Sequence, residues 1–389
     1  MERPSRIKVL HTENAMGYTG GFKALYDFIR SEKKEIESIV VLPVGSSCRT
    51  YLEEEGITVY EIPFVEINRN IIALIKYIPC LFINAYRIHK IARKERVDVL
   101  HSNDLYNLSL YLVKYVFRYD KPLVVHLRLL ASSYPSTLYL FWKKMHLRFS
   151  DALVAVSRAV AKGYGDSDKI HLVYDITHTV ERHPKYESTY RKELSRPFAF
   201  FYLANFTQGK GQDLALEAFR MVVQKYPHLT LTFAGGTLNT VENLRYRKTL
   251  QEKVSMYSLD AKIFFEGFVE DVELKMKQYD CILNFSYAES FSFTSYDALR
   301  FGIPLIVSDC GGPAELFENG RSGLLIANKN KEQMARAMIR ILEEEGLASV
   351  LSMNSKIYIQ SLLSKSNNFS YLTKLFISLS KRYMTYGVN

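Results

Sequence analysis

Two acidic side chains in the C-terminal half of the chain have the spacing of a ligand-binding pair. Glu289 lies in an expected loop after the apolar run Cys281–Phe285, and Asp297 follows eight positions later on the helix that this loop opens. At about 3.6 residues per turn, the two carboxylates fall on roughly the same face. Carboxylates accept hydrogen bonds from sugar hydroxyls, so we expect the pair to bind one extended polyhydroxylated ligand at two points.

The same loop is an expected anion site, and a second loop offers a cation. A loop that leaves a strand and opens a helix directs backbone N–H groups and the positive end of the helix dipole toward a ligand. Lys210 stands between Gly209 and Gly211, just after the apolar run Phe198–Leu203. A lysine in such a turn can bring its ammonium beside a diphosphate without steric hindrance. The alternative is an exposed turn lysine.

These segments resemble glycosyltransferase family 4, a group of retaining enzymes in which a Glu, seven residues and a second Glu occupy this loop and helix. The resemblance implies that Glu289 holds the transferred sugar and that Asp297 holds the ribose of a nucleotide. It also implies that backbone groups of Phe291, Ser292 and Phe293 meet the sugar and the diphosphate. Without this context, the two acids would be interpreted as a surface loop acid and a solvated helix residue.

In its C-terminal half, the chain departs from the family pattern at three positions. Asp297 is one carbon shorter than the usual Glu, Ser292 stands where glycine is common, and Asn205 occupies the neighbourhood of an arginine that usually accompanies the lysine. We keep Asn205 among the expected donor-binding residues. The flanking glycines, including Gly311 and Gly312, also resemble the family, and we interpret them as mainly structural.

In the N-terminal half, Gly20 and Gly21 belong to a glycine-rich stretch between the first expected strand and helix. The family resemblance implies that this loop faces the donor phosphates and the acceptor, so both glycines are expected backbone contacts. No GxGxxG spacing is present, and a tight turn without a ligand is the open alternative.

Further polar residues follow two expected strands of this half, where ligands of open α/β sheets bind. By its spacing from Pro122, Arg128 takes the place of a histidine that many family members carry. Its permanent charge could steady the leaving phosphate or the sugar, but it cannot act as a general base. Asp104 and His126 are expected on the acceptor side, and a core role for His126 is the favoured alternative. Glu289, Lys210 and Arg128 are the expected catalytic residues.

Apolar runs of strand length alternate with amphipathic stretches, and the pattern restarts in the second half of the 389-residue chain. Such alternation predicts parallel sheets covered by helices. We expect two Rossmann-like domains, residues 1–185 and 197–367, joined by the polar connector Thr177–Pro197, with a helix at about 368–389 packing back on the first. The family resemblance implies the α/β GT-B architecture, with a cleft between the two sheets.

Charge is unevenly distributed along the chain. Residues 69–148 contain 14 Lys and Arg against four Asp and Glu, a surplus equal to the net charge of +10 of the whole chain. Within this region, Ile71–Lys94 is apolar at helical spacing and carries no acid. Its most apolar part, Ile71–Ile83, is interrupted by Lys76 and Pro79 and is too short to span a membrane. A basic amphipathic helix binds anionic lipid, with about 1 kcal/mol per cation. An ordinary helix pair broken at Pro79 is the alternative.

No signal peptide is expected, and the four separate cysteines predict a reducing compartment, so we expect a cytoplasmic protein at the inner face of the membrane. We predict a retaining hexosyl-type transferase of nucleotide-sugar, UDP- or GDP-linked, acting on a glycan or lipid-linked acceptor in surface polysaccharide synthesis. Neither metal, cofactor nor nucleic acid is expected. Two alternatives stay open: a nucleotide-sugar epimerase and a partner subunit without turnover.

Overall fold

The computed structural model describes residues 6–64, 71–133, 135–176, 197–365 and 368–386, without the side chains of 71–76 and 386. Its contacts divide the chain into two compact units. Unit 1 comprises Met1–Val180 together with Ser366–Asn389, and unit 2 comprises Glu181–Lys365. The expected connector Thr177–Pro197 lies, except for its last residue, outside the described residues.

Unit 1 is built on a parallel seven-stranded sheet of order β3-β2-β1-β4-β5-β6-β7. Its strands are β1 Ile7–Thr12, β2 Ile36–Pro43, β3 Thr58–Ile62, β4 Val99–Ser102, β5 Leu123–Leu127, β6 Ala152–Ala155 and β7 Ile170–Leu172. Its helices are α1 Gly20–Glu32, α2 Cys48–Glu54, α3 Ile71–Glu95, α4 Ser109–Tyr111, η1 Leu112–Val116, η2 Ala131–Ser133, α5 Ser136–Phe149, α6 Arg158–Tyr164 and α13 Phe369–Tyr386. The strand order reverses between β1 and β4, which is the topological switch point where such sheets bind ligands.

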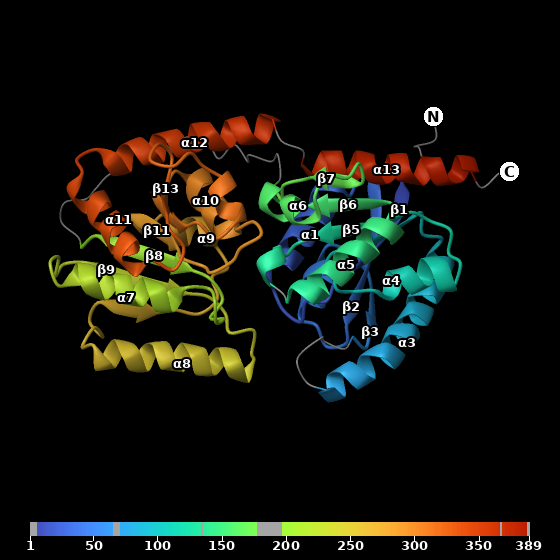
Figure 1. Cartoon of the computed structure of the whole chain (residues 1–389), viewed down its shortest axis with the longest axis horizontal. Helices are drawn as coiled ribbons and strands as arrows, with labels where there is room; N and C mark the ends of the chain where they lie inside the picture. Colours follow the sequence, from blue (N-terminus) through green and yellow to red (C-terminus); the bar gives the residue numbers. More distant parts are fainter. Residues whose placement is uncertain (1–5, 65–70, 134, 177–196, 366–367, 387–389) are drawn as a thin grey trace. The chain divides into compact units, whose positions relative to one another are not determined.

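Unit 2 repeats the architecture with a parallel six-stranded sheet of order β10-β9-β8-β11-β12-β13. Its strands are β8 Ala199–Leu203, β9 Thr230–Ala234, β10 Ile263–Phe265, β11 Cys281–Asn284, β12 Leu305–Ser308 and β13 Leu324–Ile326. Its helices are α7 Gln212–Val223, α8 Val241–Met256, α9 Val272–Met276, α10 Phe293–Phe301, η3 Gly312–Glu315, α11 Lys331–Glu343 and α12 Leu347–Lys365. Figure 1 shows helices on both faces of each sheet, as the strand and helix alternation predicts.

The C-terminal helix α13 belongs to the core of unit 1. Phe369, Leu372 and Phe376 recur at helical spacing and are at most 4% exposed. They pack with strand residues such as Val9 and with Phe28 of α1, whose ring lies 5.9 Å from that of Phe376. The last helix of the chain, red in Figure 1, therefore lies beside the blue strands formed by the first residues.

Ten expected strands are present, and the three missed strands, β3, β7 and β13, each lie at the edge of a sheet. An edge strand has a neighbour on one side alone, so it is short and only partly covered. The three residues of β7 are all partly exposed, and β3 begins with the exposed Thr58. These two segments lack the continuous apolar run that marks a strand buried on both faces. Strand β13 is apolar, with Leu324 and Ile326 buried, and is only three residues long.

Helix α3 is one helix and not the pair that the alternative interpretation described. It runs continuously from Ile71 to Glu95 with Pro79 inside it, so the proline does not end a helix. The helix packs one face inward, with Ala85, Ile88 and Ala92 fully buried. No helix among the described residues is long and apolar enough to cross a membrane.

Three histidines of neighbouring strands form a buried chain in unit 1. His11 Nδ1 lies 2.7 Å from His101 Nδ1, and His101 Nε2 lies 2.6 Å from His126 Nδ1. All three side chains are at most 2% exposed. Burial lowers the pKa of His11 to about 3 and holds the pKa values of the other two well below the ordinary range, with Arg128 adding to the effect. All three histidine side chains are therefore uncharged in the folded protein.

These histidines predict a loss of stability in acid. An unfolded histidine titrates near pH 6.5, so below that pH the unfolded state binds protons that the folded state does not, and the free energy of unfolding falls. His101→Gln should reduce the loss between about pH 7.5 and about pH 5.5 by about 1 kcal/mol. Urea unfolding followed by the fluorescence of Trp142, the single tryptophan, measures this in unit 1.

His228→Gln is the matched control, because this side chain is exposed in the turn after α7. The free energy of unfolding of this variant should change with pH as that of the wild type does. If His101→Gln also retained the wild-type pH dependence, the buried histidine chain would not be the source of acid sensitivity.

Candidate active site

The loop after β8 lies against the loop after β11 in unit 2, and their backbones touch at Gly211. This glycine has a φ of +79°, and a Cβ on it would lie 2.0 Å from the carbonyl oxygen of Phe285. The amide of Tyr287 also donates to the carbonyl of Gly209 over 2.8 Å. Only glycine permits this approach at Gly211, which explains the glycines around Lys210.

A buried tyrosine ties the two loops together. The Tyr202 hydroxyl donates to the carbonyl of Lys210 over 2.5 Å and accepts from the amide of Phe285 over 2.7 Å. The residue is 1% exposed, and burial raises the pKa of its phenol well above the ordinary value, so the proton needed for donation is retained.

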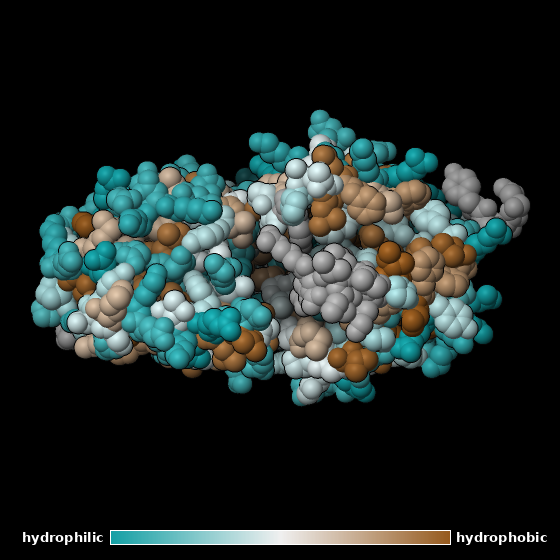
Figure 2. Space-filling view, turned by 60° about the horizontal axis from the view of Figure 1, so that its bottom comes forward, coloured by the Kyte–Doolittle hydropathy of each residue, from teal (hydrophilic) through white to brown (hydrophobic). Residues whose placement is uncertain are grey.

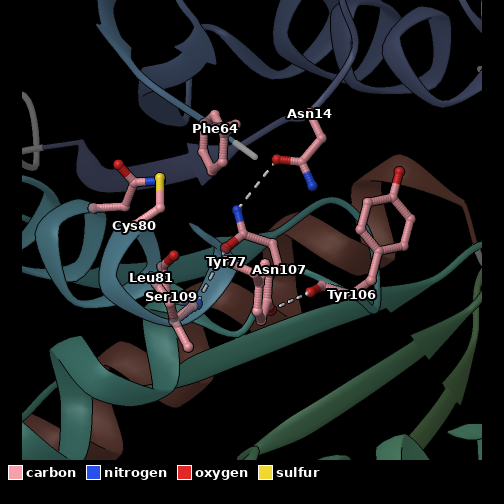
Figure 3. Close-up of a pocket in the computed structure, with 9 residues that line it drawn as sticks. Asn14, Phe64, Tyr77, Cys80, Leu81, Tyr106, Asn107 and Ser109 are labelled. Carbon is pink, nitrogen blue, oxygen red and sulfur yellow. Dashed lines mark hydrogen bonds between the residues drawn. The ribbon is translucent and has the colours of Figure 1, made fainter. Parts of the chain in front are cut away.

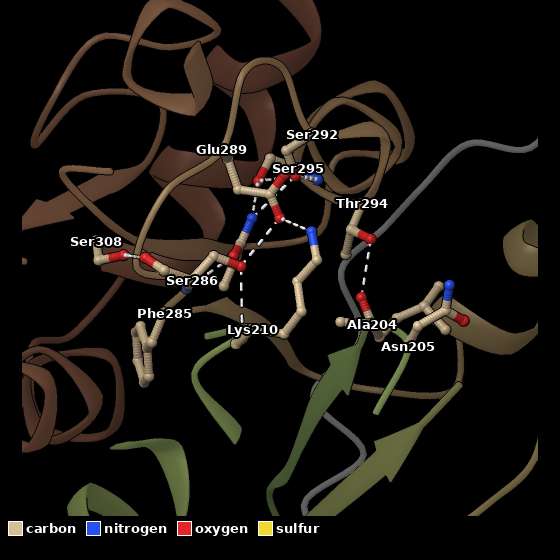
Figure 4. Close-up of polar contacts among 12 residues, drawn as sticks. Ala204, Asn205, Lys210, Phe285, Ser286, Glu289, Ser292, Thr294, Ser295 and Ser308 are labelled. Carbon is tan, nitrogen blue, oxygen red and sulfur yellow. Dashed lines mark hydrogen bonds and ion pairs between the residues drawn. The ribbon is translucent and has the colours of Figure 1, made fainter. Parts of the chain in front are cut away.

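The ammonium of Lys210 and the carboxylate of Glu289, 79 positions apart in the chain, meet at 2.6 Å. Ser286 Oγ donates to the same carboxylate oxygen, Oε1, over 2.9 Å. The two side chains are 35% and 17% exposed, so the pair is accessible to a ligand. Figure 4 shows Lys210 rising from its loop to point at Glu289, with Ser286 and Ser292 nearby. A ligand with both an anionic group and hydrogen-bond donors fits this arrangement, because the ammonium binds the anion and the carboxylate accepts from the donors.

The N-terminus of α10 is organised by Ser292. Its Oγ accepts from the amide of Ser295 over 3.2 Å and from Asn284 Nδ2 over 2.9 Å. Its φ is +121°, in the region that favours glycine, which gives a physical reason why glycine is common in the family at this place. The nine-residue helix presents its dipole and first-turn N–H groups beside the Lys210–Glu289 pair.

The other expected donor residues lie around these loops, with existing partners. Asp297 is buried within α10, and Arg300 Nη2 lies 3.1 Å from its carboxylate. Asn205 Oδ1 accepts from the amide of Gly236 over 3.2 Å, which fixes the loop after β8. The rings of Phe291 and Phe293 pack edge to face with centroids 5.3 Å apart.

Two glycines next to this loop are required by the backbone. Gly311 has a φ of +120°, and a Cβ on Gly312 would lie 2.0 Å from the carbonyl oxygen of Ser290. The amide of Gly312 donates to the carbonyl of Glu289 over 2.8 Å, and the amide of Glu289 donates to the carbonyl of Cys310 over 3.0 Å. These bonds hold the Glu289 backbone in place.

At the carboxyl edge of the unit 1 sheet, four polar side chains form a buried cluster. Arg128 pairs with Asp175 and donates to Asn103 Oδ1 through Nε at 3.1 Å and Nη2 at 3.0 Å. Asn103 in turn donates to Glu13 and, over 3.0 Å, to the carbonyl of Gly21. Burial raises the pKa values of Glu13 and Asp175, although Arg128 opposes the rise.

Within this cluster, the positive charge of Arg128 is compensated by its partners, so the residue is not the free cation that was expected. Its side chain is 12% exposed, and Asp175 and Asn103 occupy several of its donors. A phosphate would have to share the guanidinium with these partners. Gly20 and Gly21 form the first turn of α1, capped by Thr19, rather than a loop of positive φ.

Asp104 follows β4 and is 7% exposed. Its Oδ1 accepts from the amides of Tyr106 and Asn107 over 3.1 and 3.0 Å, whereas the buried Oδ2 has no partner. Burial raises the pKa of this carboxyl to about 8, and Glu13 adds to the rise. An unpartnered carboxyl at a sheet edge can bind a hydroxyl group.

His126, expected on the acceptor side with a core role as the favoured alternative, lies in the core of unit 1. The side chain is 2% exposed and is hydrogen-bonded to His101 inside the sheet. His126 lies within β5, whose five residues are all buried, whereas Arg128 follows the last residue of the strand.

Glu13, Asp175 and Tyr202 were not expected from the sequence. Nothing in the local sequence marks Asp175 or Tyr202, and their partners lie far along the chain. Glu13 does follow β1 directly, so its place at a strand end was an available signal. Among the residues that the structure describes, no group of three or more His, Cys, Asp and Glu is arranged to hold a metal ion.

Two family models match the chain. The model of glycosyltransferase family 4 matches residues 32–179, and the model of glycosyl transferases group 1 matches residues 188–357. Between them they cover most of both units.

The chain is also similar to individual curated proteins and solved structures. A lipopolysaccharide core biosynthesis mannosyltransferase, LpsB of Rhizobium meliloti, is 24% identical over 63% of this chain and 68% of that protein. Mannosylfructose-phosphate synthase of Agrobacterium fabrum is 28% identical over 39% of this chain and 34% of its own length. The chain spans 34% to 48% of the length of three curated relatives that it matches. The solved structure of Anabaena HepE with UDP-glucose has a TM-score of 0.78 and 18% identity, covering 96% of this chain and 99% of HepE. This likeness establishes the GT-B fold.

The contact at Gly211 predicts different effects of two alanine substitutions. Gly209 and Gly211 both have positive φ, which disfavours alanine by about 1–2 kcal/mol. At Gly209, however, the nearest atom to a new Cβ is 4.0 Å away, in the Tyr287 ring. Gly211→Ala should therefore lower the free energy of unfolding of unit 2 well beyond the effect of Gly209→Ala, as measured by urea unfolding. Equal losses in the two variants would show that the Phe285 contact does not constrain the loops.

Proposed function

We infer that this chain, which belongs to the glycosyltransferases that the family 4 and group 1 models describe, transfers a sugar from a nucleotide-diphosphate donor to an acceptor hydroxyl. The observation that carries the proposal is the meeting of Lys210 with Glu289 beside the N-terminus of α10. A nucleotide-sugar offers groups that match both: a diphosphate for the ammonium and the helix dipole, and hydroxyls for the carboxylate.

The chemistry follows from this placement. The bond between the anomeric carbon and the diphosphate oxygen breaks, the acceptor oxygen bonds to the same carbon, and the acceptor proton passes to the released diphosphate. Lys210 and the helix terminus stabilise the negative charge that develops on the leaving group. In the bound state, the diphosphate would replace Glu289 as a partner of Lys210, freeing the carboxylate for the sugar hydroxyls.

The remaining donor contacts are proposed residue by residue. Asp297 gives up its ion pair with Arg300 and binds the ribose hydroxyls instead. Asn205 and the backbone of residues 291–293 lie against the diphosphate and the sugar. We propose that the reaction retains anomeric configuration and needs no metal ion or cofactor, with UDP or GDP as the nucleotide.

Unit 1 supplies the proposed acceptor side. Asp104 Oδ2 has no partner and can accept a hydrogen bond from an acceptor hydroxyl or, when protonated, donate one. Arg128 and the first turn of α1 at Gly20 and Gly21 are proposed neighbours of the phosphates. LpsB and HepE support a donor linked to a nucleotide and an acceptor that is a glycan or lipid-linked, in lipopolysaccharide or another surface polysaccharide.

We propose that unit 1 also attaches peripherally to the cytoplasmic face of the cell membrane through α3. Ile78, Phe82 and Tyr86, one turn apart from each other, are 62%, 48% and 47% exposed. The Phe117 ring lies 5.9 Å from that of Tyr86, next to the exposed Tyr115 and Val116 of η1. Exposed apolar groups gather on this surface and suit insertion into a lipid headgroup layer (Figure 2).

Basic side chains accompany this apolar surface. Arg87, Lys90, Arg93 and Lys94 are all exposed, and Lys90 Nζ lies 4.8 Å above the Tyr86 ring. Their charges suit anionic lipid, each adding about 1 kcal/mol near the surface.

Removal of either member of the Lys210–Glu289 pair should abolish donor turnover. Hydrolysis of nucleotide-sugars in vitro should fall at least about 100-fold in Lys210→Ala and in Glu289→Ala, the size of effect typical for one preorganised electrostatic contact. Wild-type hydrolysis should persist in a chelator, and NMR of the transfer product should show the anomeric configuration of the donor.

Lys225→Ala is the matched control, because Lys225 pairs with Glu343 on the surface of the same unit. It should retain wild-type turnover. If wild type hydrolysed nucleotide-sugars no faster than Lys210→Ala and Glu289→Ala, the chain would be a partner subunit without turnover. Epimerised donor without transfer would identify an epimerase instead.

Membrane attachment predicts a charge-dependent effect on vesicle binding. The double variant Lys90→Glu/Arg93→Glu should bind phosphatidylglycerol vesicles at least about 30-fold more weakly than wild type in a flotation assay, since two cations are lost. Salt should weaken wild-type binding. Lys248→Glu/Lys253→Glu, on α8 of unit 2, should leave binding unchanged; an equal loss in both double variants would mean that net charge, not α3, governs attachment.

A further inference from the structure

A pocket in unit 1 lies at the topological switch point of the sheet, apart from the Arg128 cluster. It is an open hollow: the space between its walls is about 300 Å³ when the solvent at its mouth is counted. Asn14 follows β1, Phe64 follows β3, and Asn107 follows β4, so three strand ends contribute to it. Its other walls come from α3 and from the segment after β4, through Tyr77, Cys80, Leu81, Asn84, Tyr106 and Ser109. Figure 3 shows these rings and carboxamides around the hollow.

Its lining is polar but uncharged. None of the nine lining residues is Lys, Arg, Asp or Glu, and three are asparagines. Across the switch point, Asn107 Nδ2 donates to Asn14 Oδ1 over 3.4 Å. A phosphate or carboxylate ligand would find no cation here, so an anionic group is not the natural occupant.

One polar atom in the lining lacks a partner. Asn84 is 2% exposed; its Nδ2 donates to the carbonyl of Pro63 over 2.9 Å, whereas its Oδ1 is buried without a hydrogen bond. A purely apolar occupant such as an acyl chain would leave this oxygen unsatisfied, while a hydroxyl group would donate to it.

Aromatic rings complete the lining. Phe64, Tyr77 and Tyr106 are partly exposed, and the Tyr77 hydroxyl donates to the carbonyl of Tyr106 over 3.3 Å. Rings and carboxamides together match a sugar, whose C–H face packs on a ring and whose vicinal hydroxyls both donate and accept. Asp104 braces this wall, since its Oδ1 accepts from the amides of Tyr106 and Asn107.

We propose that this pocket binds an uncharged sugar ring of the acceptor and thereby selects a neutral glycan terminus over an acidic or phosphorylated one. The inference rests on the proposed sugar transfer and specifies its acceptor. Asn84 and Asn107 are the selecting residues, through hydrogen bonds to vicinal hydroxyls, and the rings supply the apolar contact.

The test uses the full-length protein and free sugars as probes. Saturation-transfer NMR should show saturable binding of methyl hexopyranosides at about millimolar concentration, the strength expected for a few hydrogen bonds and one ring contact. Glucuronic acid and hexose 6-phosphates should bind at least tenfold more weakly. Preferred binding of the charged sugars, or no hexoside binding, would overturn the proposal.

Two pocket variants assign the site. Asn84→Leu preserves the side-chain volume without the acceptor oxygen, and Asn107→Ala removes a second carboxamide; each should weaken hexoside binding at least tenfold. Asn354→Ala, which removes a partly exposed carboxamide of α12 in unit 2, should have no effect. Wild-type hexoside binding in both pocket variants would place the sugar elsewhere.

Donor hydrolysis separates this inference from the proposed function. The pocket variants should retain wild-type nucleotide-sugar hydrolysis, while Lys210→Ala should lose hydrolysis and retain hexoside binding. Failure of the Lys210→Ala result alone would count against the transferase proposal, and failure of the Asn84→Leu and Asn107→Ala results alone would count against the pocket.

Discussion

In unit 2, the backbone of the loop after β8 rests directly against the backbone of the loop after β11. Gly211 leaves room for the carbonyl of Phe285, and the Tyr202 hydroxyl bonds both loops from below. Since the same loops carry Lys210 and Glu289, this packing determines where the ammonium and the carboxylate meet. The candidate donor site is thus preorganised by backbone contacts that contain no ligand-binding group themselves.

Unit 1 handles its polar groups differently at the corresponding edge of its sheet. A buried charge is costly unless it is paired, and Arg128 is compensated by Asp175 and Asn103. The histidine chain nearby stays neutral instead, because burial depresses the pKa values of all three rings. The pocket at the switch point between β1 and β4 has an uncharged lining. This sheet edge therefore has two chemically distinct regions, the ion-paired cluster of Arg128 and the uncharged pocket.

Most of the fold and part of the candidate site follow from sequence patterns. Central strands such as Leu123–Leu127 are mostly apolar because both faces are covered, although this one also carries His126. The edge strands β3 and β7 were missed because partial exposure removes that signal. His126 and Arg128 are two positions apart, yet one lies in the histidine chain and the other in an ion pair, which no local pattern distinguishes.

The sequence by itself determined the two α/β units and the loop positions of Lys210 and Glu289, because strand periodicity and glycine-flanked turns are local properties of the chain. Only the tertiary structure decided which groups meet. The Lys210–Glu289 contact, the Asp175 partner of Arg128 and the unpartnered oxygen of Asn84 each depend on residues far apart in the chain that parallel strand order brings to one sheet edge. Local sequence specifies the elements, and their packing order specifies the chemistry at their ends.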